Sequence, residues 1–196
     1  MKKTPKIALA TLATYFLGGA TLLANMNQPD SSEEKPLEVI AAECSIDEQQ
    51  NEQGAKREYT QDEIPQLIHY VYMCTPNKSD YLSEEFLKEI VIQESKYNPT
   101  QTSKKGARGL MQIMPKAWEE VEKERNYDEH VFDPHTNLEV GIKYILWINK
   151  RFQKDYDGWK ELTPNEKKKM VLSAYNAGIS RFKKEDWQLE NMPRET

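Results

Sequence analysis

The feature that most constrains the fold is the helical spacing of apolar residues between positions 59 and 178, interrupted by capping residues and prolines. The last of these signals, Thr163-Pro164-Asn165-Glu166, is a capping box with proline at the first helical position. Gly178 suits the end of the helix that this box opens. Because no alternating strand pattern competes, the sequence predicts a mostly α-helical fold, with short extended pieces between residues 100 and 112.

Earlier helices are expected to begin at residues that cap a helix or tolerate its first turn, namely Asp62, Ser83, Pro115 and Asp133-Pro134. The second should end before Pro99. Residues with helical spacing are expected to form the buried faces: Ile64, Leu67, Ile68 and Val71 in the first helix, Trp118 and Val121 in the third, and Leu138, Ile142, Ile145, Leu146 and Phe152 in the fourth.

The N-terminus has the pattern of an export signal. Lysines at positions 2, 3 and 6 precede an uncharged, largely apolar stretch over 7–24. Leu22 and Ala24 suit a signal peptidase that cleaves after Ala24. The apolar run is also long enough for an uncleaved membrane anchor, so both outcomes stay open. Either way, the protein is expected in the periplasm or cell envelope.

The rest of the chain divides into two expected parts. Residues 25–58 are rich in polar residues and poor in large apolar ones, which predicts a flexible linker. Residues 59–196 have the size and pattern of one folded domain. With 32 acidic against 27 basic residues, the chain lacks the basic surplus typical of nucleic-acid-binding proteins.

Export also affects how the cysteines and histidines are interpreted. Cys44 and Cys74 are the only cysteines, and outside the cytoplasm such a pair forms a disulfide more often than a metal site. Whether these two are joined stays open. His69, His130 and His135 do not have metal-ligand spacing, so neither a metal nor another cofactor is expected.

Glu94 is the carboxylate that departs from the pattern of its helix. Leu87, Ile90, Val91 and Glu94 follow the spacing i, i+3, i+4, i+7, which places this acid on the apolar face. A carboxylic acid in an apolar cleft can stay protonated near neutrality and donate a proton. The spacing alone also fits a glutamate that reaches out to solvent or pairs with a base.

Three ordered motifs surround this acid. The first runs from Glu94-Ser95-Lys96-Tyr97-Asn98-Pro99 through Ser103 to Gly106-Ala107-Arg108-Gly109-Leu110-Met111-Gln112-Ile113-Met114-Pro115. The others are Asp133-Pro134 with Asn137, Gly141 and Tyr144, and then Ala174-Tyr175-Asn176-Ala177-Gly178. Together they resemble the soluble lytic transglycosylases, lysozyme-like enzymes that cleave peptidoglycan, over about residues 83–178.

The resemblance implies a lysozyme-like helical domain with Glu94 as the catalytic residue. By the same resemblance, the substrate-binding residues would be Ser103, Gln112, Met114, Tyr144 and Tyr175. The implied reaction breaks the β-1,4 bond between N-acetylmuramic acid and N-acetylglucosamine and closes a 1,6-anhydro ring, without consuming water. The implied partners are peptidoglycan glycan strands, with a secretion or pilus apparatus as a further option.

Alternatives and departures complete the sequence-based interpretation. A hydrolytic lysozyme would need a second acid, such as Asp133, to hold a water molecule. An inactive wall-binding assembly protein is the other alternative. A serine hydrolase is rejected because no histidine is placed by motif to activate Ser95. Ala117 and the Ile-Ser-Arg-Phe segment after Gly178 depart from the family pattern at its edges.

Overall fold

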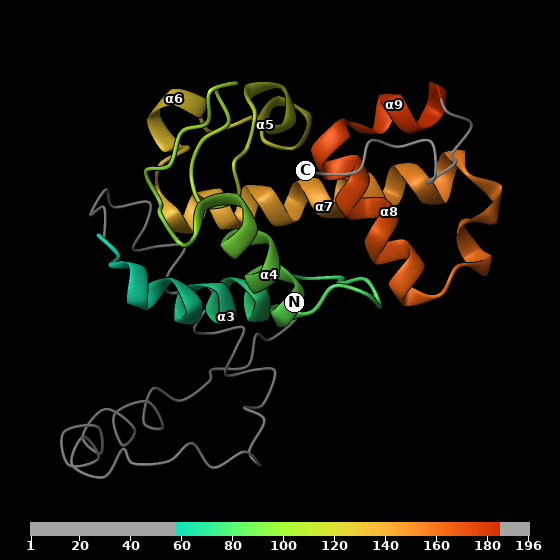
Figure 1. Ribbon diagram of the computed structural model, residues 1–196, viewed down its shortest axis with the longest axis horizontal. Helices are drawn as coiled ribbons and strands as arrows, with labels where there is room; N and C mark the ends of the chain where they lie inside the picture. The colour runs from blue at the N-terminus through green and yellow to red at the C-terminus, as the bar shows by residue number, and fades with distance from the viewer. Residues whose placement is uncertain (1–57, 185–196) are drawn as a thin grey trace, which may run out of the picture. The chain divides into compact units, whose positions relative to one another are not determined.

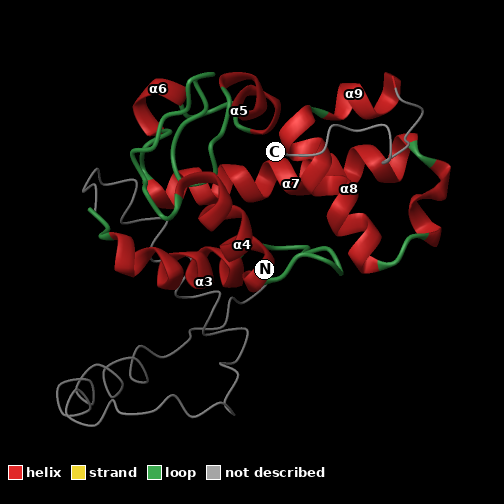
Figure 2. Cartoon of the chain, viewed as in Figure 1, coloured by secondary structure: helices red, strands yellow, loops and turns green. Residues whose placement is uncertain are grey.

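A computed structural model describes residues 58–184. The predicted signal over 1–24 and nearly all of the predicted linker lie outside the described residues. Figure 2 shows the described part as helices joined by loops, and no strand is drawn in it. Within residues 58–184, none of the helices combines the length and the apolar character needed to cross a bilayer. The predicted mostly helical fold is confirmed for this range.

Long helices and short helical turns alternate along the described chain. In order, they are the 3₁₀ turn η2 (Gln61–Glu63), α3 (Ile64–Cys74), α4 (Glu84–Ser95), α5 (Pro115–Val121), α6 (Tyr127–His130), α7 (Pro134–Asp155), the 3₁₀ turn η3 (Asp157–Glu161), α8 (Pro164–Ala177) and α9 (Ile179–Lys184). The helices predicted from capping signals are all present. α6, α9 and the two 3₁₀ turns were not predicted, because segments this short leave little periodic pattern.

Most of the predicted helix starts are confirmed by hydrogen bonds. The Ser83 hydroxyl accepts a bond from the Phe86 N–H, 3.2 Å away, at the start of α4. Asp133 caps α7 through a 2.8 Å bond from the Thr136 N–H. Thr163 and Glu166 form the predicted capping box of α8, whose end is marked by Gly178 at φ +82°.

The predicted start of the first helix was wrong. Thr60, not Asp62, caps this region, because Thr60 and Glu63 form a capping box three residues apart. The Thr60 N–H donates to the Glu63 carboxylate at 2.9 Å, and the 3₁₀ turn η2 leads from there into α3. Asp62 lies inside that turn, while Pro65 occupies the first turn of α3 as expected.

α7 runs through the middle of the fold, as Figure 1 shows, and packs against α3, α5, η3 and α8. The buried residues predicted for α3 are confirmed, as are Leu138, Ile142, Ile145 and Phe152 in α7 and Trp118 in α5. Leu146 and Val121 are instead half-buried. A helix surrounded on several sides provides fixed attachment points for the segments that carry the candidate site.

The loop between α4 and α5 contains the predicted extended pieces. Arg108 forms isolated antiparallel bridges with both Thr102 and Ile113. The Arg108 N–H donates to the Ile113 carbonyl at 3.2 Å, and the Ile113 N–H donates back at 2.9 Å. The loop over 100–113 is therefore folded on itself by backbone hydrogen bonds.

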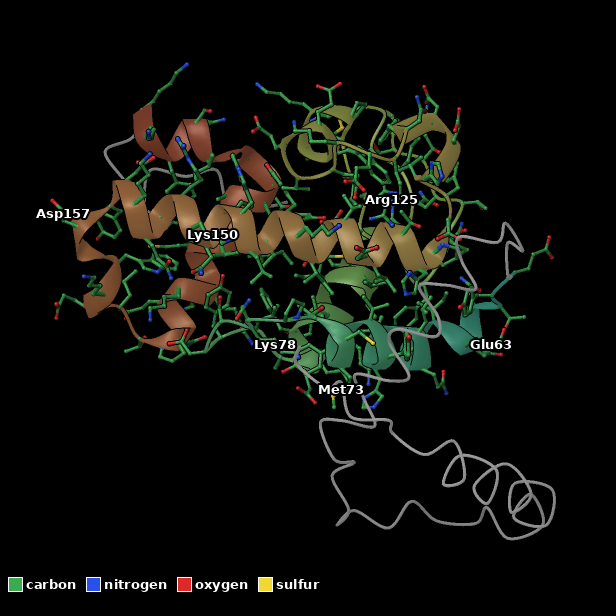
Figure 3. All side chains as sticks on the ribbon, turned by 180° about the vertical axis from the view of Figure 1, so that it is seen from behind. Glu63, Met73, Lys78, Arg125, Lys150 and Asp157 are labelled. Atoms are coloured by element: carbon green, nitrogen blue, oxygen red, sulfur yellow. The ribbon has the colours of Figure 1, made fainter. Side chains whose placement is uncertain are left out.

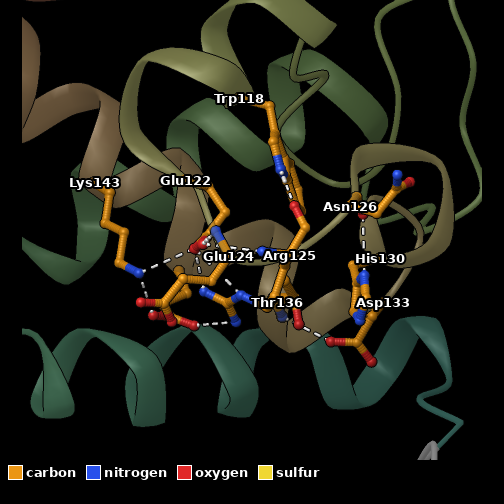
Figure 4. Close-up of polar contacts among 10 residues, drawn as sticks. Trp118, Glu122, Glu124, Arg125, Asn126, His130, Asp133, Thr136 and Lys143 are labelled. Carbon is orange, nitrogen blue, oxygen red and sulfur yellow. Dashed lines mark hydrogen bonds and ion pairs between the residues drawn. The ribbon is translucent and has the colours of Figure 1, made fainter.

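An ion network attaches the end of α5 to α7 (Figure 4). Glu122, 7% exposed, receives hydrogen bonds from the backbone N–H groups of Glu124 and Arg125. The Arg125 guanidinium lies 2.6 Å from its carboxylate, and Lys143 of α7 lies 3.3 Å away. Both cations also contact Glu139, at 2.8 Å each. Although burial opposes ionisation, these bonds and charges together lower the Glu122 pKa to about 2.

Cys74, the last residue of α3, is disulfide-bonded. Cys44, the other cysteine of the chain, lies outside the described residues. Cys74 therefore has no free thiol.

Candidate active site

Glu94 lies in the last turn of α4, immediately before a sharp change in chain direction. Leu87, Ile90 and Val91 on the same helix are buried, while Glu94 itself is half-buried. The chain then turns through two left-handed residues, Lys96 at φ 52° and Tyr97 at φ 64°. The predicted apolar stripe is confirmed, and its acid stands at the boundary between core and solvent.

The Gly106–Met114 loop is attached to α7 through Asn137, which is fully buried. The Asn137 side-chain oxygen accepts a 2.8 Å bond from the Met111 N–H. Its nitrogen donates to the carbonyls of Val131, at 2.8 Å, and Arg108, at 3.3 Å. Gly109, at φ +79°, lies so close that a Cβ there would overlap the Asn137 amide. This position requires glycine for both its backbone conformation and its lack of a side chain.

Met111 extends from this loop into the core and packs against Gly141 of α7. A Cβ at Gly141 would overlap the Met111 sulfur. A glycine inside a helix costs about 1 kcal/mol relative to alanine, so its presence in α7 indicates a close approach by another segment. Met111 is thus a core residue that anchors the loop.

Tyr175 of α8 links Glu94 to this loop. Its hydroxyl donates a 2.7 Å hydrogen bond to the Met111 carbonyl. Burial raises the Tyr175 pKa well above its ordinary value, and a negative charge on the nearby Glu94 raises it further. Tyr175 is therefore a neutral phenol whose proton is held by the loop.

Aromatic rings continue from Tyr175 along α7. The Tyr144 ring meets Tyr175 edge to face, with centroids 5.5 Å apart, and stacks on Trp147 at 5.6 Å. Glu94, Tyr144 and Tyr175, predicted from separate motifs, are thus brought together by α4, α7 and α8. Trp147 was missed by the sequence analysis because it lies just outside the motif that contains Tyr144.

The remaining predicted residues lie in the loop or at its end. Ser103 accepts a 3.0 Å bond from the Ala107 N–H. Gln112, at φ 47°, turns its side-chain nitrogen back toward the carbonyls of Gln101 and Gly109, at 3.0 and 2.9 Å. In this arrangement both residues brace the loop. Met114 is 41% exposed, as a residue available to a substrate would be.

Ser95 and Asp133, the residues on which a serine hydrolase and a hydrolytic lysozyme would depend, form hydrogen bonds within the fold. The buried Ser95 hydroxyl donates to the Val91 carbonyl at 3.1 Å, within its own helix. One oxygen of Asp133, the suggested second acid of a hydrolytic enzyme, is engaged in capping α7. Neither arrangement resembles an activated nucleophile or an acid placed to hold a water molecule.

Comparisons with known proteins agree with these motifs. Residues 72–194 match the transglycosylase SLT domain family. Membrane-bound lytic murein transglycosylase E of Buchnera aphidicola subsp. Acyrthosiphon pisum is 39% identical over 88 residues, which are 42% of this chain and 39% of that protein. The soluble lytic murein transglycosylase of Salmonella typhimurium is 28% identical over 107 residues, or 52% of this chain and 15% of that protein.

Membrane-bound lytic murein transglycosylase C of Shigella sonnei is 27% identical over 103 residues, covering 50% of this chain and 27% of that protein. The chain thus spans less than half the length of each of these relatives. No solved structure gives a significant match. Because the family match covers more than half of the chain and includes every motif from Glu94 to Gly178, the chain belongs to the transglycosylase SLT domain family.

Proposed function

We propose that this protein is a lytic transglycosylase that cleaves the glycan strands of peptidoglycan. The observation that carries the proposal is the placement of Glu94 at the end of an apolar helical stripe, close to Tyr175 and to the loop that Tyr175 holds. The names of three relatives in the same family support the activity.

In the proposed reaction, Glu94 acts first as an acid. It donates its proton to the oxygen between N-acetylmuramic acid and N-acetylglucosamine, and the bond from that oxygen to the muramic anomeric carbon breaks. Positive charge develops on the sugar ring as the N-acetylglucosamine portion leaves with the proton.

Glu94 then acts as a base. Its carboxylate takes the proton of the muramic 6-hydroxyl, whose oxygen bonds to the anomeric carbon and closes the 1,6-anhydro ring. The acid is regenerated, no water is consumed, and one carboxyl group performs both steps. A second carboxylate is not required, in contrast to ordinary glycosidases.

The other site residues would position the strand. Tyr144 and Met114 would contact the sugars, and Ser103 and Gln112 would keep the loop in shape beside them. Because the Tyr175 proton is already donated to the Met111 carbonyl, we assign Tyr175 as a positioning residue for the loop. The predicted export signal would deliver the domain over 59–196 to the envelope, where peptidoglycan lies.

Product analysis tests this proposal. Purified peptidoglycan is digested with the wild type and with Glu94→Gln, and the fragments are separated and weighed by mass spectrometry. We expect anhydro ends, one water lighter than reducing ends, with the wild type only. Reducing ends alone would instead support the hydrolytic lysozyme, and wild-type levels of cleavage by Glu94→Gln would refute Glu94 as the catalytic residue.

A further inference from the structure

A second region with features of a binding site lies beside the starts of α4 and α8, the two helices whose last turns carry Glu94 and Tyr175. This cavity, of about 520 Å³, is bordered by the 76–80 loop before α4, by the second half of α7, by Trp159 and by Lys167. Lys167 lies in the second turn of α8 and Tyr175 in its last turn, eight positions further on. At 1.5 Å per residue the two are separated by about 12 Å along the helix. The side of the cavity that Lys167 forms therefore lies away from Tyr175, and Glu94 is not among the lining residues.

The cavity lining carries a surplus of positive charge. Lys78, Lys150 and Lys167 are set against one carboxylate, Asp80, which Lys167 contacts at 3.1 Å. Figure 3 shows Lys78 and Lys150 on the same side of the molecule, on the loop after α3 and on α7. Lys78 is held in place by hydrogen bonds to the carbonyls of Met73 and Thr75, at 3.3 and 2.7 Å. Desolvation lowers its pKa, so its charge would be stabilised by an anion beside it.

Asn149 adds a polar side chain to the wall of this cavity. This residue lines the cavity and is only 7% exposed, yet its side-chain amide has no hydrogen-bond partner among residues 58–184. Because the amide lines the cavity and is not among the fully enclosed side-chain atoms without a partner, a ligand can take the place of water there. The amide nitrogen can donate a hydrogen bond and the neighbouring lysines can only donate, so the cavity suits a ligand with negatively charged acceptor oxygens.

We propose that this cavity binds a carboxylate group of a peptide. The carboxylate oxygens would accept hydrogen bonds from Asn149 and from the ammonium groups of Lys78 and Lys150, with Leu146 and Trp159 forming the apolar wall. The choice of peptide rests on the proposed function, because peptidoglycan strands carry short peptides with free carboxylates. Binding there would attach the domain to the cell wall at a point away from the bond that it cleaves.

Titration calorimetry on the full chain tests the ligand with three probes. These are a wall-derived stem peptide with free carboxylates, the same peptide with its carboxylates amidated, and inorganic phosphate. We expect saturable binding of the first and about tenfold weaker binding of the second, since charge-assisted hydrogen bonds are lost. Equal binding of the two peptides, tighter binding of phosphate, or no saturable binding would overturn the proposal.

Matched variants test the location. Lys150→Gln changes an exposed residue and should weaken peptide binding about three- to tenfold, as should Asn149→Leu, whose folding is checked by its melting curve. Lys154→Gln, on the same helix but outside the lining, should bind as the wild type does. Unchanged binding by both cavity variants, or equal weakening in Lys154→Gln, would refute this location.

The same variants separate this inference from the proposed function. Cleavage of peptide-free glycan strands depends on Glu94 and should proceed unchanged in Lys150→Gln. If the wild type binds the peptide but cleaves no glycan, the proposed function fails and the cavity assignment stands. If it cleaves glycan but binds no peptide, the cavity assignment fails and the enzyme assignment stands.

Discussion

The ends of α4 and α5 each hold a glutamate, and the two environments differ in kind. Glu122, after α5, is buried among Arg125, Lys143 and two backbone N–H groups, which keep it ionised. Glu94, in the last turn of α4, is half-buried, and its charge acts on the neutral phenol of Tyr175. The first arrangement binds two helices together, whereas the second leaves a carboxyl group beside an aromatic surface. Burial alone therefore does not identify a catalytic acid; the partners of the carboxylate distinguish the two.

The largest expected effect is the loss of cleavage activity when Glu94, the proposed catalytic acid, is replaced. Glu94→Gln should lower kcat/KM for peptidoglycan cleavage about 10²- to 10⁴-fold, because the group that transfers the proton is lost. Stability should change by less than about 1 kcal/mol, since the residue is only half-buried and the amide has nearly the same shape. Cleavage rates and urea unfolding measure the two effects. If Glu94→Gln lowered the free energy of unfolding as much as is expected for Glu122→Gln, the two glutamates could not be distinguished as catalytic and structural.

Glu122→Gln should show the opposite pattern. Removing this charge leaves Arg125 and Lys143 with Glu139 as their remaining partner, and breaking a buried ion pair costs about 3–5 kcal/mol. We expect about 2–3 kcal/mol here, because both cations are partly exposed and an amide still accepts hydrogen bonds. Glu124→Gln, two positions away and exposed, is the matched control and should change stability by about 0.5 kcal/mol at most. Equal effects of the two would show that the network does not stabilise the fold.

The pH dependence of stability sharpens the same contrast. Because the folded-state pKa of Glu122 is about 2, below the ordinary value of 4.5, its contribution is fully present above pH 4.5 and is lost as the pH falls toward 2. The shift corresponds to about 3 kcal/mol, which solvent screening at the exposed parts of the network reduces to about 1–2 kcal/mol. The difference in unfolding free energy between wild type and Glu122→Gln should therefore shrink between pH 6 and pH 2.5. A difference that is constant over that range would contradict the assignment.

The smallest expected effect is that of Tyr175→Phe, which tests whether Tyr175 positions the loop or only stabilises the fold. Tyr175→Phe removes the hydrogen bond to the Met111 carbonyl and should cost about 1 kcal/mol of stability and roughly tenfold in activity, since the loop beside Glu94 loses a support. Tyr72→Phe removes a longer bond of the same kind, 3.3 Å, to the carbonyl of Leu82, just before the start of α4. That control should lose the same stability or less, with unchanged activity. Equal activity losses in the two variants would argue against a positioning role for Tyr175.

Sequence patterns predicted the helices well where their signals are local. The capping residues Ser83, Asp133 and Thr163 act on N–H groups three positions away, so their effect is visible in the sequence itself. The same logic missed Thr60, because Asp62 offered an equally plausible cap within the same short stretch. α6 and α9 were missed because helices of four and six residues are too short to show a helical period in the sequence.

The candidate site was predicted as a set of residues but not as an arrangement. Glu94 stood out because a charge interrupted an apolar stripe, and the three motifs named its companions. The roles of Asn137 and Gly141 in holding the loop could not be predicted from their spacing. Nor could the inward turn of the Gln112 amide, which depends on a left-handed backbone at that residue.

The sequence by itself determined the helical class, the family and the carboxylate most suited to acid chemistry, because each follows from local spacing or motif order. Only the tertiary structure decided what surrounds that carboxylate. The Met111 backbone is held by Asn137 and Tyr175, which are 26 and 64 positions further along the chain. Contacts across such separations form only when α7 and α8 pack together, and they leave no periodic trace in the sequence. The same packing set Glu122 among cations and Glu94 beside a phenol.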